Sequence, residues 1–216
     1  MSRALIIAVD GPAASGKGTI AARLAAAYGL PHLDTGLLYR AVGIGVLDAG
    51  GSLEDPAAAE AVARALDASH LTDTDRLTDR GAGEAASRVA GYPGVRAALL
   101  EFQRAFASQP GGAVLDGRDI GTVIAPEAPA KLFVTATPEV RAMRRWKQLT
   151  GRGEVIAFED MLADIGRRAE RDAGRGAAPM GQAPDAVLLD TTDMDIEAAF
   201  DAARRIVEAA RAKHGL

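Results

Sequence analysis

The stretch VDGPAASGKGT, residues 9–19, decides the fold, because it joins an apolar run to a helical pattern through a glycine loop. Its Gly-x4-Gly-Lys spacing, which ends at Lys17, matches a phosphate-binding loop whose backbone N–H groups surround the phosphates. The usual loop continues with a Ser or Thr that ligates Mg²⁺, but here Gly18 follows and the hydroxyl comes at Thr19. We therefore predict that nucleotide oxygens and water hold most of the Mg²⁺ ligand positions.

All nine residues from Gly11 to Thr19 are candidates for ATP binding. The glycines let the backbone approach the phosphates closely, and the Lys17 ammonium can reach the β- and γ-oxygens as a mobile point charge. Thr19 is expected to serve the nucleotide phosphates. The ATP-binding candidates are Gly11, Pro12, Ala13, Ala14, Ser15, Gly16, Lys17, Gly18 and Thr19.

Short apolar runs alternate with helical patterns along the chain, which is typical of an α/β fold with a parallel sheet. The helix after the loop is expected to end at Gly29, another to begin at Thr137, and a third to cover residues 195–213. The inner side of that last helix is expected to carry Ile196, Phe200, Ala203 and Val207. The predicted strands are Ala4–Val9, Pro31–Asp34, Ala113–Leu115, Lys131–Ala136 and Ala186–Leu189.

Two polar stretches interrupt this pattern, and we predict a three-layer, five-stranded parallel sheet with two inserts in one domain, residues 1–216. The first insert, about 50–94, is rich in Ala, Asp and Gly with weak periodicity. The second, about 150–184, holds a dense arginine cluster. The core would then consist of residues 1–49, 95–149 and 185–216.

The composition is that of an ordinary soluble globular protein, with 48% hydrophobic and 25% charged residues. The net charge of −4 argues against a partner such as nucleic acid or a membrane surface. No apolar run approaches the roughly 20 residues of a bilayer span, and the first is too short for a signal peptide, so we expect a cytoplasmic protein. The absence of cysteine excludes disulfides and thiol chemistry. The histidines, which lack ligand-like spacing and are interpreted as surface or packing residues, are His32, His70 and His214.

Cationic residues in two further segments suit a second phosphate-bearing substrate. The segment DTGLLYR, residues 34–40, follows the first helix, and DGRDIGT, residues 116–122, follows the strand Ala113–Leu115. Ligands of open parallel sheets bind at the carboxyl ends of the strands, where the second segment lies. The candidates from these segments are Thr35, Tyr39, Arg40, Asp116, Arg118 and Asp119.

The segment RRAERDAGR, residues 167–175, places Arg168, Asp172 and Arg175 on one helix face by their spacing of four and three. Two guanidiniums beside a carboxylate suit a nucleotide, because the cations bind phosphate and the carboxylate binds a ribose hydroxyl. An isolated arginine-rich helix is more often a solvated face with salt bridges, but the polar insert around it favours binding. The run RAMRR, residues 141–145, either lines the adenine side of the ATP site or lies on the surface.

Five segments occur in the order and approximate spacing of bacterial cytidylate kinases, and the chain resembles this family of P-loop nucleoside monophosphate (NMP) kinases from Ala4 to the last helix. DGRDIGTV is specific, because adenylate kinases have a proline before the arginine and guanylate and thymidylate kinases differ again. The resemblance implies an ATP-dependent kinase that converts CMP and dCMP to CDP and dCDP in pyrimidine metabolism, by direct in-line transfer with Mg²⁺. It also implies an NMP-binding insert, a lid and a monomer. The segments are DGPAASGKGT, HLDTGLLYRA, SRVAGYPGVRAAL, VLDGRDIGTVIAPEAPAKLFV and RRAERDAGR.

The resemblance also implies a role for each matching residue. Lys17 would stabilise the transferring group, Arg40 and Arg118 would hold the CMP phosphate, and Asp116 would hold Mg²⁺ through water. The base would be bound by Ser87, Arg96 and Asp119 and the ribose by Asp172 with Arg168, while Arg175 would add a lid contact. The catalytic candidates are Lys17, Arg40, Arg118 and Arg168. The substrate-binding candidates are Thr35, Tyr39, Arg40, Ser87, Arg96, Arg118, Asp119, Arg168, Asp172 and Arg175.

One segment departs from the family pattern. The stretch between Leu66 and Ser87 is shorter than in family members that carry a small β-sheet there, so we expect a hairpin or a loop. The ranking of CMP, dCMP and UMP as substrates therefore stays open. Two rival functions are a kinase for another small phosphate acceptor and a P-loop switch or scaffold. DGRDIGTV argues against the first, and Gly18 without an Asn-Lys-x-Asp motif argues against the second.

Overall fold

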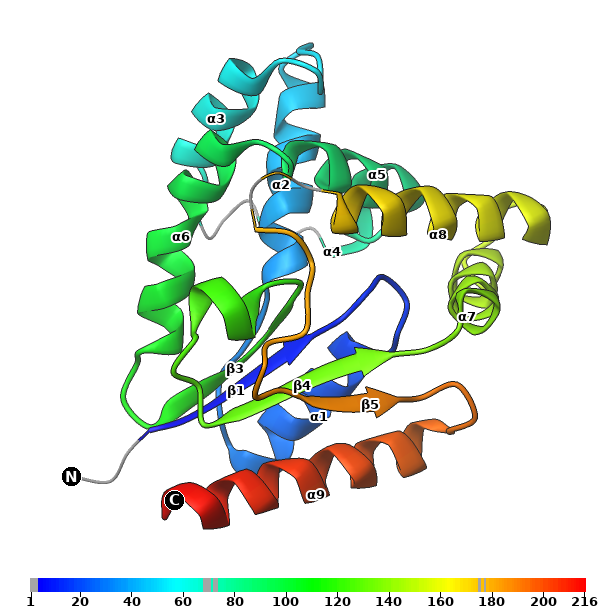
Figure 1. Ribbon diagram of the computed structural model, residues 1–216. Helices are drawn as coiled ribbons and strands as arrows, with labels where there is room; N and C mark the ends of the chain where they lie inside the picture. The colour runs from blue at the N-terminus through cyan, green and yellow to red at the C-terminus, as the bar shows by residue number, and fades with distance from the viewer. Residues whose placement is uncertain (1–3, 68–70, 72–73, 175, 177) are drawn as a thin grey trace.

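The computed structural model describes residues 4–67, 71, 74–174, 176 and 178–216, and its centre is a five-stranded parallel sheet (Figure 1). The strand order is β2-β3-β1-β4-β5, and each neighbouring pair runs parallel. All five predicted strands are confirmed, with ends that shift by at most two residues. The strands are β1 (Leu5–Asp10), β2 (His32–Asp34), β3 (Gly112–Gly117), β4 (Ala130–Thr135) and β5 (Val187–Asp190).

Helices cover both faces of the sheet, so the predicted three-layer α/β architecture is confirmed. One apolar core joins the sheet to α1 (Lys17–Tyr28) and α9 (Ile196–His214). The other joins it to α2 (Thr35–Asp48), α6 (Pro93–Ala107) and the π-helix η2 (Ile120–Ile124). Because the inner strands β1, β3 and β4 are buried on both faces, their sequences read as near-continuous apolar runs, whereas Val187 and Leu188 of the edge strand β5 are exposed.

The helix ends follow the predicted signals, with one correction in α9. Gly29 ends α1 in the left-handed conformation, and the Thr137 hydroxyl accepts a hydrogen bond from the Val140 N–H at the start of α7 (Pro138–Thr150). The prediction of an inward Ile196 was wrong, since its side chain is 62% exposed. It begins α9 at the mouth of a cavity, whereas Ala203, deeper in the helix, is fully buried.

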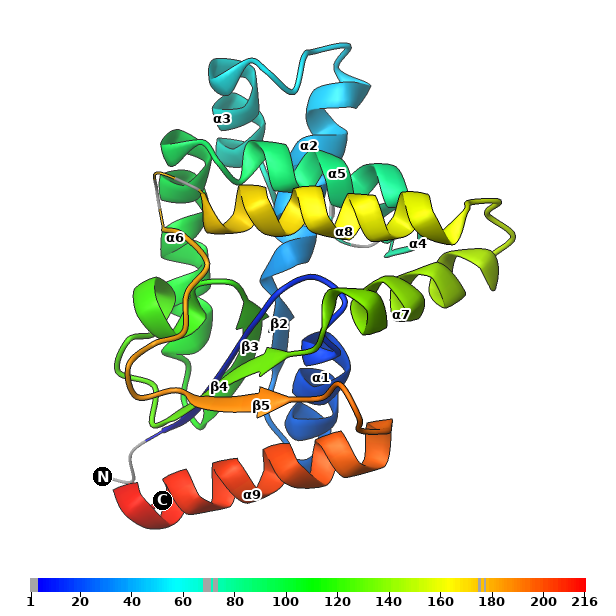
Figure 2. The same ribbon diagram turned by 45° about the vertical axis from the view of Figure 1, so that its right-hand side comes forward.

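Beyond the carboxyl ends of the strands lies a group of helices from residues 56–89 and 158–173 (Figures 1 and 2). They are α3 (Pro56–Arg64), α4 (Thr74–Leu77), α5 (Arg80–Val89) and α8 (Phe158–Ala173). In both views α5 and α8 lie side by side. The expectation of a hairpin or loop in residues 66–87 was wrong for the described part of that segment, which contains α4 and the start of α5 and no strand.

Small side chains explain why α5 forms there. Asp79 caps the helix by accepting a hydrogen bond from the Ala82 N–H, and Ala85 and Ala86 let α5 pack directly on α2. The approach is so close that a Cβ at Gly43 of α2 would lie 2.6 Å from the Ala85 Cβ. The alanines and glycines that look weakly periodic in sequence are therefore a helix-packing surface.

Helices α7 and α8 share a small apolar core of their own, built from Ala142, Leu149, Met161 and Ile165. The rings of Trp146 and Phe158 pack edge to face beside it, with centroids 6.5 Å apart. We refer to α7 and α8 together as the lid hairpin. The division of the chain into core and inserts stays a prediction. Within the described residues, no helix has the length and apolar character needed to cross a bilayer.

Candidate active site

The loop between β1 and α1 has the backbone of an anion-binding site. Gly11, Ala14 and Gly16 all have positive φ, at 148°, 61° and 91°. Only glycine fits at position 11, where a Cβ would lie 2.0 Å from the Val134 carbonyl oxygen. Ala14 holds a conformation that costs an alanine energy, as is common in ligand-binding loops. The loop leads into the N-terminus of α1, whose free N–H groups favour a phosphate.

Asp10 ties this loop to η2 on the neighbouring segment. Its carboxylate accepts hydrogen bonds from the N–H groups of Ile120 at 2.8 Å and Gly121 at 2.7 Å. Burial raises the pKa of Asp10 to about 6, although both hydrogen bonds act in the opposite direction. This role of Asp10 was not predicted from the sequence, in which its position just before the loop glycine was the only signal.

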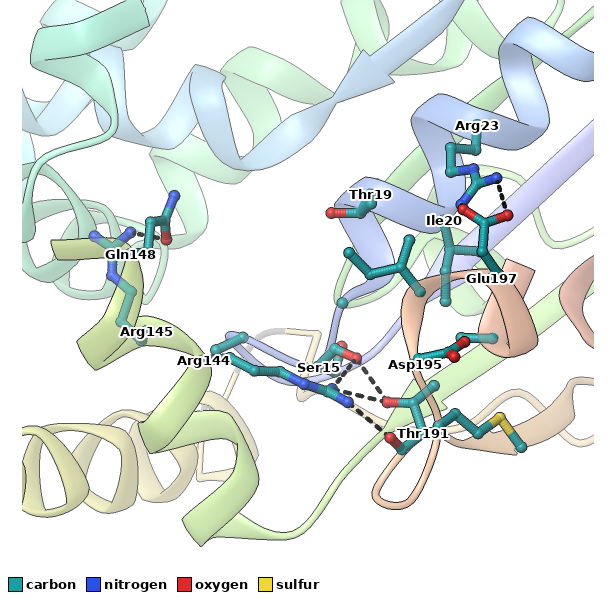
Figure 3. A pocket seen from close by; sticks show the side chains of 15 residues that line it. Ser15, Thr19, Ile20, Arg23, Arg144, Arg145, Gln148, Thr191, Asp195 and Glu197 are labelled. Atoms are coloured by element: carbon teal, nitrogen blue, oxygen red, sulfur yellow. Dashed lines mark hydrogen bonds and ion pairs between the residues drawn. The ribbon is translucent and has the colours of Figure 1, made fainter. Parts of the chain in front are cut away.

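Two arginines of α7 hold the loop from the side. Arg144 donates to the Ser15 carbonyl at 3.1 Å and to the Thr191 carbonyl at 2.7 Å (Figure 3). Arg141 donates to the Ala13 carbonyl at 3.3 Å. Burial lowers the pKa of both guanidiniums. These arginines thus support the loop backbone, a role that neither alternative for residues 141–145 included. Their helical spacing directly after a strand end was an available signal.

A cavity of about 670 Å³ opens beside the loop, a volume typical of small-ligand sites (Figure 3). Arg145 and Gln148 of α7 line one side of the cavity, and Arg23 and Glu197 line the side that faces them. The Arg23 guanidinium donates two hydrogen bonds to the Glu197 carboxylate, of 2.8 and 2.7 Å. The predicted ATP residues that line it are Ala14, Ser15, Gly16 and Thr19. The predicted ATP residues that do not line it are Gly11, Pro12, Ala13, Lys17 and Gly18.

Lys17 and Asp116 form an ion pair at the carboxyl end of β3, with Lys17 Nζ 3.3 Å from Asp116 Oδ1. His32 Nε2 lies 2.9 Å from the other carboxylate oxygen. Burial lowers the pKa of Lys17, and nearby Arg118 lowers it further. Burial acts to raise the pKa of Asp116, but Lys17 and His32 outweigh it and the pKa is lowered.

The surroundings of Asp116 fit a role toward hydrated Mg²⁺. Its Oδ1 atom is buried, lies 3.3 Å from Lys17 Nζ and has no other hydrogen-bond donor among the described residues, so it can also accept a hydrogen bond from a metal-bound water. A Cβ at Gly18 would lie 3.8 Å from this oxygen, so the carboxylate stands next to the position where other loops carry a hydroxyl. Among the described residues, no three His, Asp or Glu side chains gather as a metal cluster.

The predicted substrate residues converge on a second, much smaller cavity of about 40 Å³. They come from α2, α5, α6, α8 and the end of β3, so residues far apart in the sequence meet at one point. Thr35 also donates a hydrogen bond of 2.8 Å to the Asp116 carbonyl, which joins α2 to β3. The predicted residues that line this cavity are Thr35, Tyr39, Ser87, Arg96, Arg118, Asp119 and Arg168.

Ion pairs occupy much of this space. Arg118 donates to Asp172 at 2.9 Å, and Arg96 pairs with Asp119. Asp172 is almost fully buried and lies 3.5 Å from the Ser87 hydroxyl, so the lid hairpin contacts the first insert here. The predicted Arg175 lies outside the described residues.

Two further guanidiniums are only partly satisfied. The Nε atoms of Arg40 and Arg168 are buried without a hydrogen-bond partner among the described residues. Arg40 donates from another nitrogen to the Leu77 carbonyl at 3.2 Å. Burial lowers the pKa of Arg168 to about 9, and the nearby cations Arg118, Arg40 and Arg145 lower it further while Asp172 opposes them. The site therefore carries excess buried positive charge, which an anion would neutralise.

Comparisons with known proteins agree with this geometry. The sequence profile described as cytidylate kinase matches residues 7–210. The cytidylate kinase of Caulobacter vibrioides is 71% identical, over 98% of this chain and 99% of that protein. That of Caulobacter sp. strain K31 is 68% identical over 98% of each chain. A crystal structure of an uncharacterized protein from Eubacterium ventriosum, 16% identical, covers 95% of this chain and 99% of its own with a TM-score of 0.56, which supports the fold.

Proposed function

The chain belongs to the cytidylate kinase family of nucleoside monophosphate kinases, and on that premise we propose that it catalyses the reaction ATP + CMP (or dCMP) ⇌ ADP + CDP (or dCDP). The observation that carries the proposal is the buried cation cluster between the loop and the inserts. The cluster consists of Lys17, Arg40, Arg118, Arg145 and Arg168. Burial, together with repulsion from neighbouring cations of the cluster, lowers the pKa values of Lys17, Arg145 and Arg168. The phosphates of two nucleotides supply the negative charge that such a cluster needs.

ATP fits the loop and the 670 Å³ cavity beside it. The phosphates lie against the backbone of residues Gly11 to Thr19 and the N-terminus of α1, and the nucleoside lies between α7 and the start of α9. Lys17 reaches the β- and γ-oxygens. Mg²⁺, bound with ATP, neutralises charge on these oxygens, and Asp116 is the residue that would hold one of its waters.

CMP fits the small cavity under the lid hairpin once that cavity opens. Arg40, Arg118 and Arg168 bind its phosphate beside Thr35 and Tyr39. Ser87, Arg96 and Asp119 bind the base, Asp172 binds the ribose, and Arg175 adds a lid contact. A cavity of about 40 Å³ is too small for a nucleotide, so α5 and α8 separate before CMP enters. When CMP binds, contacts with the substrate replace the ion pairs Arg96–Asp119 and Arg118–Asp172.

The transfer needs no covalent intermediate with the protein. A phosphate oxygen of CMP attacks the γ-phosphorus in line, the bond from that phosphorus to the β-phosphate oxygen breaks, and ADP leaves. The chain contributes positioning and charge neutralisation through Lys17 and the arginines. Closure of α5 and α8 over the reacting groups excludes water, which protects ATP from hydrolysis.

The proposed reaction also implies a metabolic role and a cellular location for the enzyme. We place the enzyme in pyrimidine nucleotide metabolism in the cytoplasm, as a monomer that acts on free nucleotides. The net charge of −4 supports the exclusion of nucleic acid and membrane partners, because binders of polyanionic surfaces are usually basic.

A coupled ADP-release assay with Mg²⁺ and ATP tests the proposal across AMP, CMP, dCMP, UMP, GMP and dTMP. We expect strong turnover with CMP and dCMP alone, because the base contacts of Arg96 and Asp119 select cytosine. Comparable turnover of UMP would show that base selection is looser than proposed. Turnover of no monophosphate at all would refute the assigned reaction.

A further inference from the structure

Three side chains form a continuous line from the sheet to the phosphate-binding loop. His32 Nε2 lies 2.9 Å from Asp116 Oδ2, and Asp116 Oδ1 lies 3.3 Å from Lys17 Nζ. The Asp116 side chain is 1% exposed and the His32 side chain 24%. His32 thus approaches a buried carboxylate from the side opposite to Lys17, and the mechanism above gives it no role.

The register of the sheet creates this contact. His32 of β2 pairs with Val114 of β3, and Asp116 lies two residues further along the same strand. Because side chains two apart in a strand point to the same face, His32 and Asp116 are diagonal neighbours on one face. That face is the one covered by α1, whose first residue is Lys17.

The direction of the hydrogen bond follows from the charge on Asp116. A carboxylate beside an ammonium group is ionised and can only accept hydrogen bonds. The Nε2 atom of His32 therefore carries a hydrogen and donates it, whether or not the ring is also protonated at Nδ1. Asp116 Oδ2 is thus bound by His32 of β2, while Oδ1 faces Lys17 at the start of α1.

We propose that His32 is a positioning residue for phosphoryl transfer: it holds Oδ2 of the Asp116 carboxylate so that Oδ1 is the oxygen that faces Lys17. The proposal rests on the proposed function. Without His32, Oδ2 would be a buried acceptor with no partner, and the carboxylate would rotate to place both oxygens on Lys17. Lys17 would then be held back from the ATP phosphates, and Asp116 would lose its orientation toward a metal-bound water.

Two substitutions separate positioning from packing. His32→Gln keeps a donor at about the same distance from the backbone, whereas His32→Leu removes it. His214, in the last turn of α9, offers a matched control through His214→Leu, because it lies at the opposite end of the fold from the loop. Loss of the partner that orients a ligand group typically costs about 10–100-fold in activity or metal affinity.

We expect His32→Leu to lower kcat about 10–100-fold while the KM for CMP stays within about twofold, because His32 does not line the small cavity. In calorimetry with ADP, the gain in affinity that Mg²⁺ produces should shrink about tenfold in the same variant. His32→Gln should stay within about threefold of the parent in both measurements, and His214→Leu should change neither.

The calorimetric arm distinguishes this proposal from the proposed function, since ADP binding does not depend on which monophosphate is the acceptor. If the parent protein turns over no monophosphate, the proposed reaction is refuted. If that parent still binds ADP more tightly with Mg²⁺, and His32→Leu weakens this gain, the role of His32 in positioning Asp116 is retained. The positioning role would be overturned if His32→Leu kept the kcat and the Mg²⁺ dependence of the parent. It would also be overturned if His32→Gln lost as much kcat and Mg²⁺ dependence as His32→Leu. If His32→Leu does not fold, His32→Asn, whose amide is too short to reach Asp116, takes its place.

Discussion

The Arg118 guanidinium donates a hydrogen bond of 2.9 Å to the Asp172 carboxylate and so joins the end of β3 to α8 of the lid hairpin. Arg118 is half-buried and Asp172 buried, at 14% and 2% exposed, and both are predicted substrate ligands. Each neutralises the other in the closed arrangement, so the pair holds the lid hairpin against the sheet. Substitution of either residue should therefore affect stability as well as chemistry.

Arg118→Ala should lower kcat by roughly 10³–10⁵, because an arginine that stabilises the transferring phosphoryl group is worth that much in related chemistry. Its melting temperature should also fall, since the buried Asp172 carboxylate loses the Arg118 guanidinium that neutralises it. The double variant Arg118→Ala/Asp172→Asn also removes the negative charge of Asp172. Its melting temperature should therefore recover, whereas its kcat should not. Steady-state kinetics and thermal melts of both variants check this, and a near-normal kcat in Arg118→Ala would contradict the role.

Two of the three loop glycines, Gly11 and Gly18, should respond differently to alanine. Gly11→Ala should destabilise the protein by more than about 2 kcal/mol, because its Cβ would overlap the Val134 carbonyl oxygen and φ is 148°. Gly18→Ala, in the first turn of α1, meets nothing closer than 3.8 Å and should be neutral or slightly stabilising. Urea unfolding of both proteins measures the difference. Equal stabilities would show that the loop can shift to accept a side chain.

Asp10 should make the folded state less stable as pH rises. Its pKa is raised from 3.8 to about 6 on folding, so the folded protein binds its proton more tightly than the unfolded chain does. Its stabilising contribution is full below pH 3.8 and is lost as pH rises through 6. Relative to Asp10→Asn, the parent should lose about 2 kcal/mol between about pH 4.5 and pH 7.5. Urea unfolding of both proteins at these pH values gives the difference, and a pH-independent difference would contradict it.

The contact between α5 and α8 should contribute to CMP binding. Arg80 of α5 lies 2.5 Å from Asp164 of α8, and both side chains are partly exposed. Arg80→Ala should raise the KM for CMP about two- to fivefold at low salt, as expected for an exposed ion pair, and 1 M salt should remove the difference. Arg64→Ala is the control, because Arg64 pairs with Glu60 within α3. An equal effect of both variants, or an effect that salt does not change, would argue against closure through this pair.

Much of the site was predictable because its residues lie at strand ends or in one short loop. Lys17 sits at the start of α1, and Asp116, Arg118 and Asp119 lie at or just beyond the end of β3, as parallel strands with helical crossovers require. The α5 segment was mispredicted although Arg80, Glu84 and Arg88 recur every fourth residue, because its buried side consists largely of alanine and glycine and the helix forms through close packing on α2. The loop-supporting roles of Arg144 and Asp10 were not predicted because most of their partners are backbone groups, which the sequence of side chains does not reveal.

By itself the sequence determined the order of strands and helices, the phosphate-binding loop and the set of cations, since these depend on spacing along a short length of chain. Only the tertiary structure decided which carboxylate each cation meets: Asp116 for Lys17, Asp119 for Arg96 and Asp172 for Arg118. Two of these contacts join residues that are 54 and 99 positions apart. Such pairings depend on how distant elements pack, because packing sets which charges share a buried space.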